Sequence, residues 1–509
     1  MISALMKHLW PGPLLFLGYW TALQSLGEKF LRDPGMFWHT RTGEKILAEG
    51  FIRSDPYTFT FAGTWWVPYQ WLGEVCMAIL HSISGLDSLL VVSTATVAAL
   101  ITWLTCKLLR TGLHPIFAFA AILLTVAASS SHYHVRPHLF TFIGMSVTIS
   151  ALIAYEQNKI KISELAWLIP FMILWSNIHG GVLGGLSTLA ICYFGWVVFS
   201  IFKLNSPLSG YRDGLIVAGI GILCCASIFI SPYGSDLPKT WFLITGMPKL
   251  PDLIQEHSRF ELSNPMGWPV LAVALLYGLI LFGIPKSSVR VTWLLPICWL
   301  IQAMFRIRHG SIFSIVAMIT IIDMWPHTHW ANWLARNRPD IYRPSNSKIS
   351  DLPSILMTMI FSVGLILVFQ ANNISLPLFG NGNARLNPVR WPIEVLEELK
   401  DREPQSPGQS SHIFNDYIDG GYILYHAPNY RVFVDDRCEV FGDDWLENLV
   451  IASQHDTDIW MERWQQQYGP FHFALTRTDT EFDRYFQKHR DEWALVKRGQ
   501  YSAFYQRIR

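Results

Sequence analysis

The sequence predicts an α-helical polytopic membrane domain followed by a small α/β soluble domain. Hydrophobic residues make up 51% of the 509 residues and charged residues only 15%, against roughly 25% charged in an ordinary soluble protein. Apolar runs of about 17–24 residues, the length a helix needs to cross a bilayer, recur up to about residue 371. Beyond that point Pro, Gly, Asn and Ser become frequent and the apolar runs stop.

The predicted spans begin with Leu9–Leu26, which we take as a transmembrane helix because it lacks a clear signal-peptide cleavage site and many spans follow it. Further spans are predicted near residues 86–108, 115–131, 138–155, 164–178, 182–203, 213–231, 267–284, 291–305, 309–325 and 352–371. Residues 1–371 thus form a membrane domain of about eleven transmembrane helices.

Residues 27–85 form the first external loop in this scheme. Residues 36–49 predict a helix that is too short and too charged to span, with apolar positions at Met36, Ile46 and Leu47, so we expect it at the membrane interface. The apolar run at 70–84 is ambiguous, and its assignment fixes the orientation of every later span.

The distribution of Lys and Arg decides that orientation, because short basic loops stay in the cytoplasm. If residues 70–84 are interfacial and the N-terminus is inside, every cytoplasmic loop is basic, and these loops hold Lys107/Arg110, Lys159/Lys161, Lys203/Arg212, Lys286/Arg290 and Arg336/Arg338/Arg343/Lys348. If residues 70–84 span, all of these move outside. We therefore expect an interfacial segment and an external C-terminus.

Residues 372–410 read as a linker and 411–509 as an external α/β domain. Short β-rich runs at 411–414, 430–434, 471–476, 493–498 and 501–506 alternate with helical patterns at 417–426, 444–467 and 479–489. This alternation predicts a mostly parallel sheet that ends in a hairpin. Asp435, Asp436, Arg437 and Glu439 follow a strand, where charges can mark a ligand crevice but are more often solvated turn residues.

The unusual polar residues of the membrane domain gather on the external face. Arginine suits a phosphate because its planar fork donates two hydrogen bonds. A single arginine at a helix end more often snorkels to lipid headgroups, but a convergent set favours a binding site. We assign to substrate binding Arg41, His134, Arg136, His138, His179, Arg306, Arg308 and His309.

The acidic candidates are fewer. Asp33 stands before Pro34, which is equally typical of a helix N-cap, and His39 lies in the same stretch. Glu256 and Glu261, in the long external loop, are candidates for a second carboxylate, although loop glutamates are usually solvated. A histidine-ligated metal is disfavoured because Pro137 disturbs the helical spacing of His134 and His138.

The stretches DPGMFWHTRTGEKIL and RSDPYTFTFAGTWWVPYQWLGEV resemble the first external loop of bacterial multi-spanning glycosyltransferases of the GT-C class. HVRPHLFTF and the later segments IFNDYIDGGYIL and YRVFVDDRCEVFGDDW resemble further blocks of the same membrane proteins. The resemblance covers most of the chain, but these blocks do not define a substrate.

This resemblance implies a GT-C fold and transfer of a sugar from a polyprenyl-phosphate carrier at the external face. It also implies that an acid of the first external loop acts as catalytic base or supports the site. That acid is Asp33 here, and we add His39 and Glu256 as catalytic candidates. Many relatives carry a second acid where this chain has Gly35, so we assign no cofactor and leave a divalent metal unsupported.

The sequence therefore predicts an inverting glycosyltransferase of the bacterial inner membrane, with its C-terminal domain on the periplasmic side. Its partners are a polyprenyl-phosphate-linked sugar, membrane lipid and an acceptor glycan, lipid or protein. The net charge of +1 gives no reason to expect nucleic acid. A lipid or sugar transporter is disfavoured because charges avoid the centres of the spans. A catalytically silent assembly protein is the other alternative.

Overall fold

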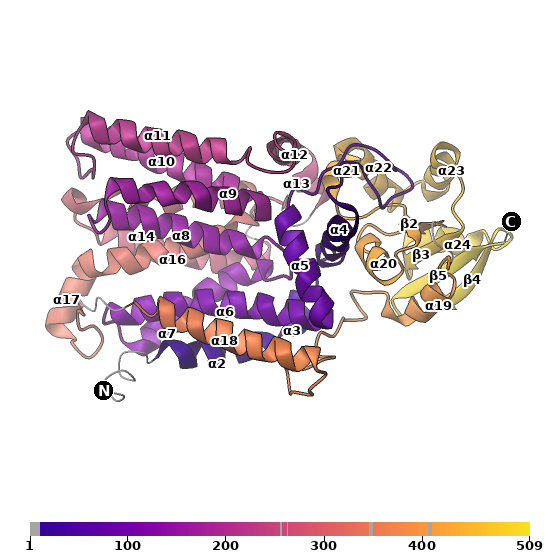
Figure 1. Cartoon of the computed structure of the whole chain (residues 1–509), viewed down its shortest axis with the longest axis horizontal. Helices are drawn as coiled ribbons and strands as arrows, with labels where there is room; N and C mark the ends of the chain where they lie inside the picture. Colours follow the sequence, from indigo (N-terminus) through magenta and orange to yellow (C-terminus); the bar gives the residue numbers. More distant parts are fainter. Residues whose placement is uncertain (1–10, 255–256, 262, 346–349, 406–409, 509) are drawn as a thin grey trace.

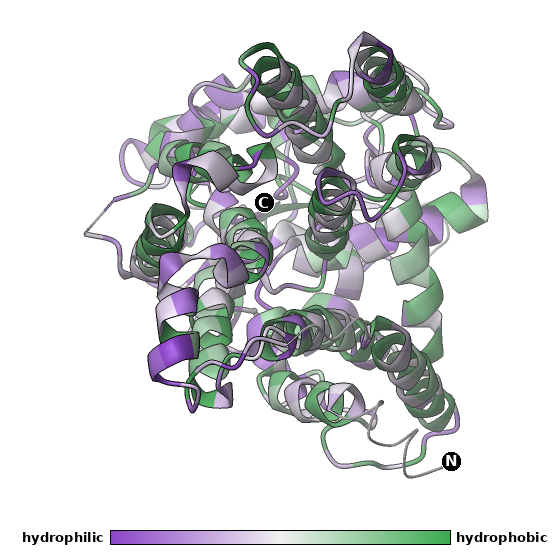
Figure 2. Ribbon diagram, turned by 90° about the vertical axis from the view of Figure 1, so that its left-hand side faces the viewer, coloured by the Kyte–Doolittle hydropathy of each residue, from purple (hydrophilic) through white to green (hydrophobic). Residues whose placement is uncertain are grey.

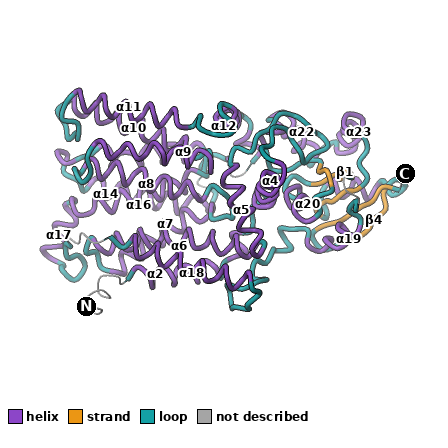
Figure 3. The backbone as a smooth tube through the Cα atoms, in the orientation of Figure 1, coloured by secondary structure: helices purple, strands orange, loops and turns teal. Residues whose placement is uncertain are grey.

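The computed structural model describes residues 11–508 except 255–256, 262, 346–349 and 406–409. Long helices from the first 371 residues lie side by side along the long axis of the molecule, and the strands lie beyond one end of this bundle (Figures 1 and 3). The first helix of the bundle, α2, and the last two strands, β4 and β5, lie far apart along the long axis of the molecule. The predicted fold class, a helical membrane domain with a small α/β domain, is confirmed.

Among the described residues, seven helices are long and apolar enough to cross a membrane. With the short 3₁₀ turns that extend three of them, they are α6 (Leu86–Arg110), α7 (Pro115–His132), α8 (Leu139–Glu156), α10 (Val182–Ile201), α14 (Pro265–Phe282), α16 (His309–His327) and α18 (Leu352–Ala371). The other four predicted spans are also helical but shorter: α2 (Gly12–Gln24), η2 with α9 (Ile162–Ile178), α11 (Tyr211–Ser227) and η6 with α15 (Val291–Phe305). Hydrophobic residues cover most of the bundle helices when they are viewed end-on (Figure 2).

Two helices of the first external loop lie across the end of the bundle that faces the strands (Figure 1). They are α4 (Gly35–Glu49) and α5 (Trp71–Ser84). They approach so closely at Gly43 that an added Cβ would lie 1.9 Å from the carbonyl oxygen of Glu74. Met36 and Ile46 are buried as expected, whereas Leu47 is exposed. The predicted interfacial helix 36–49 therefore exists, but it is covered on its outer side by the C-terminal domain.

Shorter helices fill the turns between the spans. They are α3 (Gly27–Phe30), α12 (Asp236–Thr245), α13 (Leu250–Leu253) and α17 (His329–Asn337). The α3 turn is tied to the connection between α7 and α8, because the backbone N–H of Val135 donates to the carbonyl of Phe30 (3.0 Å). This bond brings the HVRPH stretch beside Asp33, although the two are far apart in the sequence.

The C-terminal domain contains a five-stranded sheet in the order β2-β1-β3-β5-β4. The strands are β1 (Ser411–Asn415), β2 (Tyr430–Val432), β3 (Phe473–Arg477), β4 (Trp493–Arg498) and β5 (Ser502–Arg507). β1 pairs in parallel with β2 and β3, while β5 runs antiparallel to β3 and β4. The expected parallel arrangement with a final hairpin is therefore present.

The helices of this domain are α19 (Leu396–Asp401), α20 (Gly420–His426), α21 (Cys438–Phe441), α22 (Asp443–Ala452), α23 (Thr457–Tyr468) and α24 (Glu481–Lys488). Phe37 of α4 packs edge-on against Tyr422 of α20 (ring centroids 5.5 Å apart). The first external loop also joins the sheet edge, because Thr58 pairs in parallel with Val432 of β2. The loop and the C-terminal domain thus form one packed unit over the end of the bundle.

Candidate active site

A cavity of about 260 Å³ lies between the external loop and the helix ends of the bundle. Residues from the α3–α4 connection, the α7–α8 turn, the α9–α10 turn and the start of α16 line it. Seven of the predicted site residues are among them: Asp33, His134, Arg136, His138, His179, Arg308 and His309. Residues drawn from across the first 309 positions thus converge on one space.

Asp33 and Arg136 form an ion pair at the wall of this cavity. One guanidinium nitrogen, Nη1, lies 3.0 and 3.1 Å from the two carboxylate oxygens. Asp33 Oδ1 also accepts the backbone N–H of Gly35 (2.8 Å) at the start of α4. Asp33 thus bonds the first residue of α4 and also lines the cavity, although the residue at the N-cap position of the helix is Pro34 rather than Asp33.

Gly35 is required by this arrangement. A Cβ added there would lie 2.8 Å from both the Arg136 guanidinium and Asp33 Oδ1. A side chain at this position would push the ion pair apart. The glycine at position 35 is therefore coupled to the close approach of Arg136.

Arg136 also sets the ionisation of Asp33. Burial raises the pKa of the Asp33 carboxyl, but the charges of Arg136 and His134 and the hydrogen bonds outweigh burial and bring the pKa below its ordinary value. Asp33 is consequently ionised at neutral pH. A carboxylate held in an ion pair is a weak base, so it would take a proton only late, when bond formation has acidified the acceptor hydroxyl.

His39 does not line the cavity as its assignment to the catalytic group would require. It is fully buried behind Arg136, where its Nε2 lies 3.4 Å from Arg136 Nη2 and its Nδ1 lies 2.8 Å from Glu74 Oε1. Glu74, on α5, is also fully buried. Glu74 carries no signal in the sequence, because the segment that forms α5 is identified by its apolar residues.

The histidines at the rim are held by the backbone. The Nε2 atoms of His134 and His138 donate to the carbonyls of Ser131 (2.9 Å) and His132 (2.7 Å). Burial, followed by the charge of Arg136, lowers the pKa of His138 well below its ordinary value. His138 is therefore neutral, and its Nδ1 keeps a lone pair that can accept a hydroxyl proton.

His179 has the same tautomer but bonds the backbone through its other ring nitrogen. Its Nδ1 accepts the backbone N–H of Gly181 (2.9 Å), so its proton is on Nε2. Burial and then Arg136 lower the pKa of His179 to about 3. The cavity thus offers neutral acceptors and donors beside its two arginines.

Two other predicted arginines lie elsewhere. Arg41 binds Glu44 and the carbonyl of Tyr425 and does not line the cavity, so we correct its assignment to substrate binding. Arg306 donates to the Thr245 carbonyl (3.3 Å) and lines an adjoining groove.

That adjoining groove has a volume of about 410 Å³ and lies between α10 and α15. It shares with the cavity Leu183, Gly184, Thr245, Trp299, Arg308 and His309. Farther along α10 it is lined by Thr188 and Ile191. The cavity thus continues into a groove among bundle helices that is lined by both apolar and polar side chains, and Arg308 lies where the two spaces meet.

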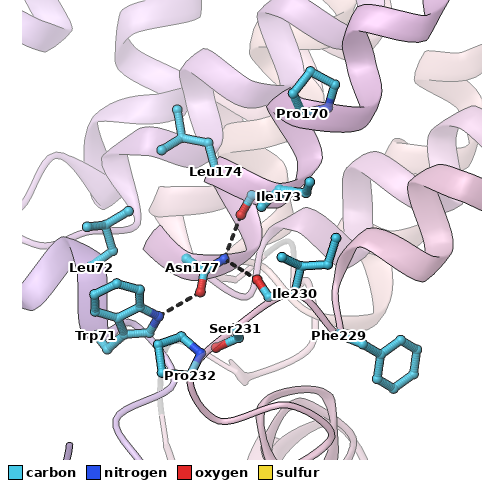
Figure 4. Close-up of a pocket in the computed structure, with 10 residues that line it drawn as sticks. All are labelled: Trp71, Leu72, Pro170, Ile173, Leu174, Asn177, Phe229, Ile230, Ser231 and Pro232. Carbon is cyan, nitrogen blue, oxygen red and sulfur yellow. Dashed lines mark hydrogen bonds between the residues drawn. The ribbon is translucent and has the colours of Figure 1, made fainter.

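Another pocket, of about 550 Å³, lies between α5, α9 and α11 (Figure 4). Its centre is Asn177, which accepts from Trp71 Nε1 (2.7 Å) and donates to the carbonyls of Ile173 (2.7 Å) and Ile230 (2.9 Å). None of the residues lining this pocket is charged.

The C-terminal domain contributes buried charges that the sequence analysis expected to be solvated. Arg437 Nη2 lies 2.7 Å from Asp55 Oδ1 and 2.6 Å from Asp435 Oδ2, and all three side chains are buried. The Arg437 guanidinium also lies 4.5 Å from the Trp66 ring centroid. This triad fastens the domain to the first external loop.

Asp436 stands between Asp435 and Arg437 in the chain, and its Oδ1 is buried without a hydrogen-bond partner among the described residues. Burial raises the pKa of Asp436 well above its ordinary value, with Asp33 adding to the rise and Arg136 opposing it. The carboxyl is thus near enough to Asp33 and Arg136 for their charges to act on it. It is a second candidate for the proton acceptor.

Glu256 lies outside the described residues, and Glu261 is exposed and bonded to Ser263 (3.1 Å). In the part of the chain that the structure describes, no three His, Cys, Asp or Glu side chains are grouped to hold a metal ion.

Comparison with known proteins rests on structure. No protein-family model and no curated protein sequence matches the chain. The oligosaccharyltransferase AglB of Archaeoglobus fulgidus, in complex with an inhibitory peptide and a dolichol-phosphate, matches with a TM-score of 0.54 and 12% identity over 93% of this chain and 69% of that one. ArnT of Cupriavidus metallidurans, bound to undecaprenyl phosphate, matches with a TM-score of 0.53 and 10% identity over 97% of both chains. The chain therefore has the GT-C fold that these polyprenyl-phosphate-dependent glycosyltransferases share.

Proposed function

We propose that this protein is a membrane glycosyltransferase that moves a sugar from a polyprenyl-phosphate donor to an acceptor hydroxyl. One observation carries the proposal: a carboxylate and two arginines share a cavity that opens into a groove between bundle helices, where Leu183, Ile191 and Leu295 supply apolar surface. Arginines beside a groove between membrane helices match a phosphate on a long hydrocarbon chain. The two structural neighbours are recorded with lipid phosphates of this kind.

The donor would bind with its phosphate at Arg308, near Arg136 and Arg306, and with its tail between α10 and α15. The acceptor oxygen attacks the anomeric carbon in line, so a bond from that carbon to the acceptor forms as its bond to the phosphate oxygen breaks. Asp33 takes the acceptor proton, and the polyprenyl phosphate leaves with its charge balanced by arginine. This single displacement inverts the anomeric centre.

The neutral histidines would contact the sugar. His138 Nδ1 can accept a sugar hydroxyl, and His179 Nε2 can donate to one. Neither role requires a metal ion.

We place the reaction on the external face of a bacterial inner membrane. The basic loops support this placement, because they lie at the bundle end opposite the cavity and positive loops stay in the cytoplasm. The C-terminal domain would then be periplasmic.

The test is transfer by the purified protein in liposomes that contain a polyprenyl-phosphate sugar. We expect release of polyprenyl phosphate and a glycosylated acceptor, both lost in Asp33→Asn. Uptake or flipping of the lipid without cleavage would instead favour a transporter. Thermal stabilisation by polyprenyl phosphate with no transfer of any sugar would favour a silent binding protein.

A further inference from the structure

We propose that Glu74 and His39 are positioning residues that hold Arg136 against Asp33. Glu74 fixes the tautomer of His39 so that an unprotonated Nε2 faces Arg136. This inference rests on the proposed function, since Asp33 is its reacting group. It assigns a role to a buried acid that the sequence analysis did not identify.

Hydrogen-bond chemistry determines the tautomer. A guanidinium has only donors, so His39 Nε2 must accept wherever Arg136 donates to it. The contact is long, at 3.4 Å. A neutral imidazole has one proton, which must then be on Nδ1 and point to Glu74 Oε1, 2.8 Å away. Each bond therefore requires the other.

Because both side chains are buried, no other hydrogen-bond partner can take the place of His39 or Glu74. His39 and Glu74 are 0% and 1% exposed, so water cannot replace a lost partner. Burial and then the charge of Arg136 lower the pKa of His39 well below its ordinary value, which keeps the ring neutral. Without an acceptor at position 74 the ring is free to move its proton to Nε2, and two N–H groups would then face each other at Arg136.

The consequence reaches Asp33 through the guanidinium. Arg136 lowers the pKa of Asp33 against the effect of burial. If Arg136 moves away, burial dominates and the pKa of Asp33 rises. Transfer requires ionised Asp33, so its rate falls at low pH as Asp33 takes up a proton. This fall, the acid limb of the pH–rate profile, would then move to higher pH.

The same two helices provide a matched control. His81 of α5 lies 2.8 Å from Glu44 of α4, which is the same pair of residue types at the same distance. The side chains of this second pair are partly exposed, at 19% and 30%, and neither is among the residues that line the cavity. A role limited to holding α4 against α5 would make the two pairs equivalent.

The variants to compare are Glu74→Met, which removes the acceptor, Glu74→Gln, which keeps one, and Glu44→Met as the control. We expect Glu74→Met to lower transfer at saturating donor by about 100-fold and to shift the acid limb upward. Glu74→Gln should stay within a few-fold of the original protein, and Glu44→Met should leave both readouts unchanged. Wild-type rate and pH profile in Glu74→Met, or equal losses in Gln and Met, would overturn the proposal.

A measurement without catalysis separates this inference from the proposed function. Thermal unfolding in detergent should show that Asp33→Asn lowers the midpoint less in the Glu74→Met background than in the original protein, because the Asp33–Arg136 pair is already weakened. In the Glu44→Met background the two effects should add. Additive effects in both backgrounds would contradict the positioning role even if no sugar is transferred. If Glu74→Met does not fold, His39→Phe removes the same Arg136 acceptor without a change in α5.

Discussion

The two Asp-Pro pairs of the first external loop have the same local chemistry and different surroundings. Asp33 accepts the backbone N–H of Gly35 and pairs with Arg136, while Asp55 accepts that of Tyr57 (3.2 Å) and pairs with Arg437. The Arg136 side chain is 21% exposed and faces the cavity, whereas that of Arg437 is 0% exposed. The same ion pair is thus suited to catalysis where it faces a cavity, and to fastening two domains where it is sealed.

The largest expected difference is in turnover. Asp33→Asn keeps the oxygen that accepts from Gly35 but removes the base, so we expect transfer to fall by about 10²–10⁴-fold, with a smaller loss of stability than in Asp55→Asn. Asp55→Asn is the control, because it should destabilise the fold while properly folded molecules keep their rate. Sugar transfer per folded protein in liposomes measures both. Full turnover in Asp33→Asn would reduce Asp33 to a cap and leave Asp436 as the acid to test.

The next effect is on stability. Arg437→Met leaves Asp55 and Asp435 buried without their cation, and breaking a buried pair in this way costs about 3–5 kcal/mol. Arg136→Met should lower the unfolding free energy by less, because Arg136 is partly exposed and Asp33 faces a cavity. Denaturation in detergent compares them. Equal losses of unfolding free energy in the two variants would show that exposure to the cavity does not make the Asp33–Arg136 pair less important for stability than the Arg437 pairs.

A smaller effect is expected on donor affinity. Arg308→Lys keeps the charge but loses the fork, and a lost charge-assisted hydrogen bond is worth about 1.5–3 kcal/mol, or roughly ten- to hundredfold in affinity. The same change at Arg41, which is bonded to Glu44 and the Tyr425 backbone, should not alter binding. Titration with polyprenyl phosphate gives both constants. Unchanged affinity in Arg308→Lys would place the phosphate elsewhere in the cavity.

The smallest effect distinguishes Asp33 from Asp436 by pH. A base must be deprotonated, and the pKa of Asp33 is lowered while that of Asp436 is raised. If Asp33 is the base, transfer should stay level as pH falls toward its ordinary pKa of about 3.9. The stability that the Asp33 pair contributes is likewise present above that pKa and lost as pH falls through the lower folded value. An acid limb well above pH 4 that disappears in Asp436→Asn would make Asp436 the base.

The sequence predicted the helices and strands well because their signals are local. Apolar runs mark the bundle, and β-rich runs between turn residues mark the strands. The positive charge of the loops predicted that residues 70–84 do not span the membrane. The helix that they form, α5, lies across the end of the bundle. His134, Arg136 and His138 were found because polar residues at a helix end stand out in an apolar chain.

The rest depends on contacts between distant segments. In the sequence, Glu74 looks like any acidic residue in the first turn of a helix. Its role depends on the packing of α4, which places His39 against it. Arg437 stands in a charged segment that is typical of a solvated turn. Only the folded structure brings Asp55, 382 positions earlier, into contact with it. Arg41 has the same appearance as Arg136 in the sequence, but its partners Glu44 and Tyr425 hold it away from the cavity. No local pattern distinguishes these cases.

The contact between Asp55 and Arg437 has a consequence for biogenesis. At about 5–20 residues per second, the ribosome needs about 20–80 s to reach Arg437 after it has made Asp55. Throughout that interval the first external loop lacks the strand that Thr58 joins and the cation that pairs with Asp55. This loop, which also carries Asp33, therefore packs fully only after the segment that holds Arg437 has been translated. A bundle inserted without its C-terminus would present an unfinished loop, which gives membrane proteases a means to recognise truncated copies.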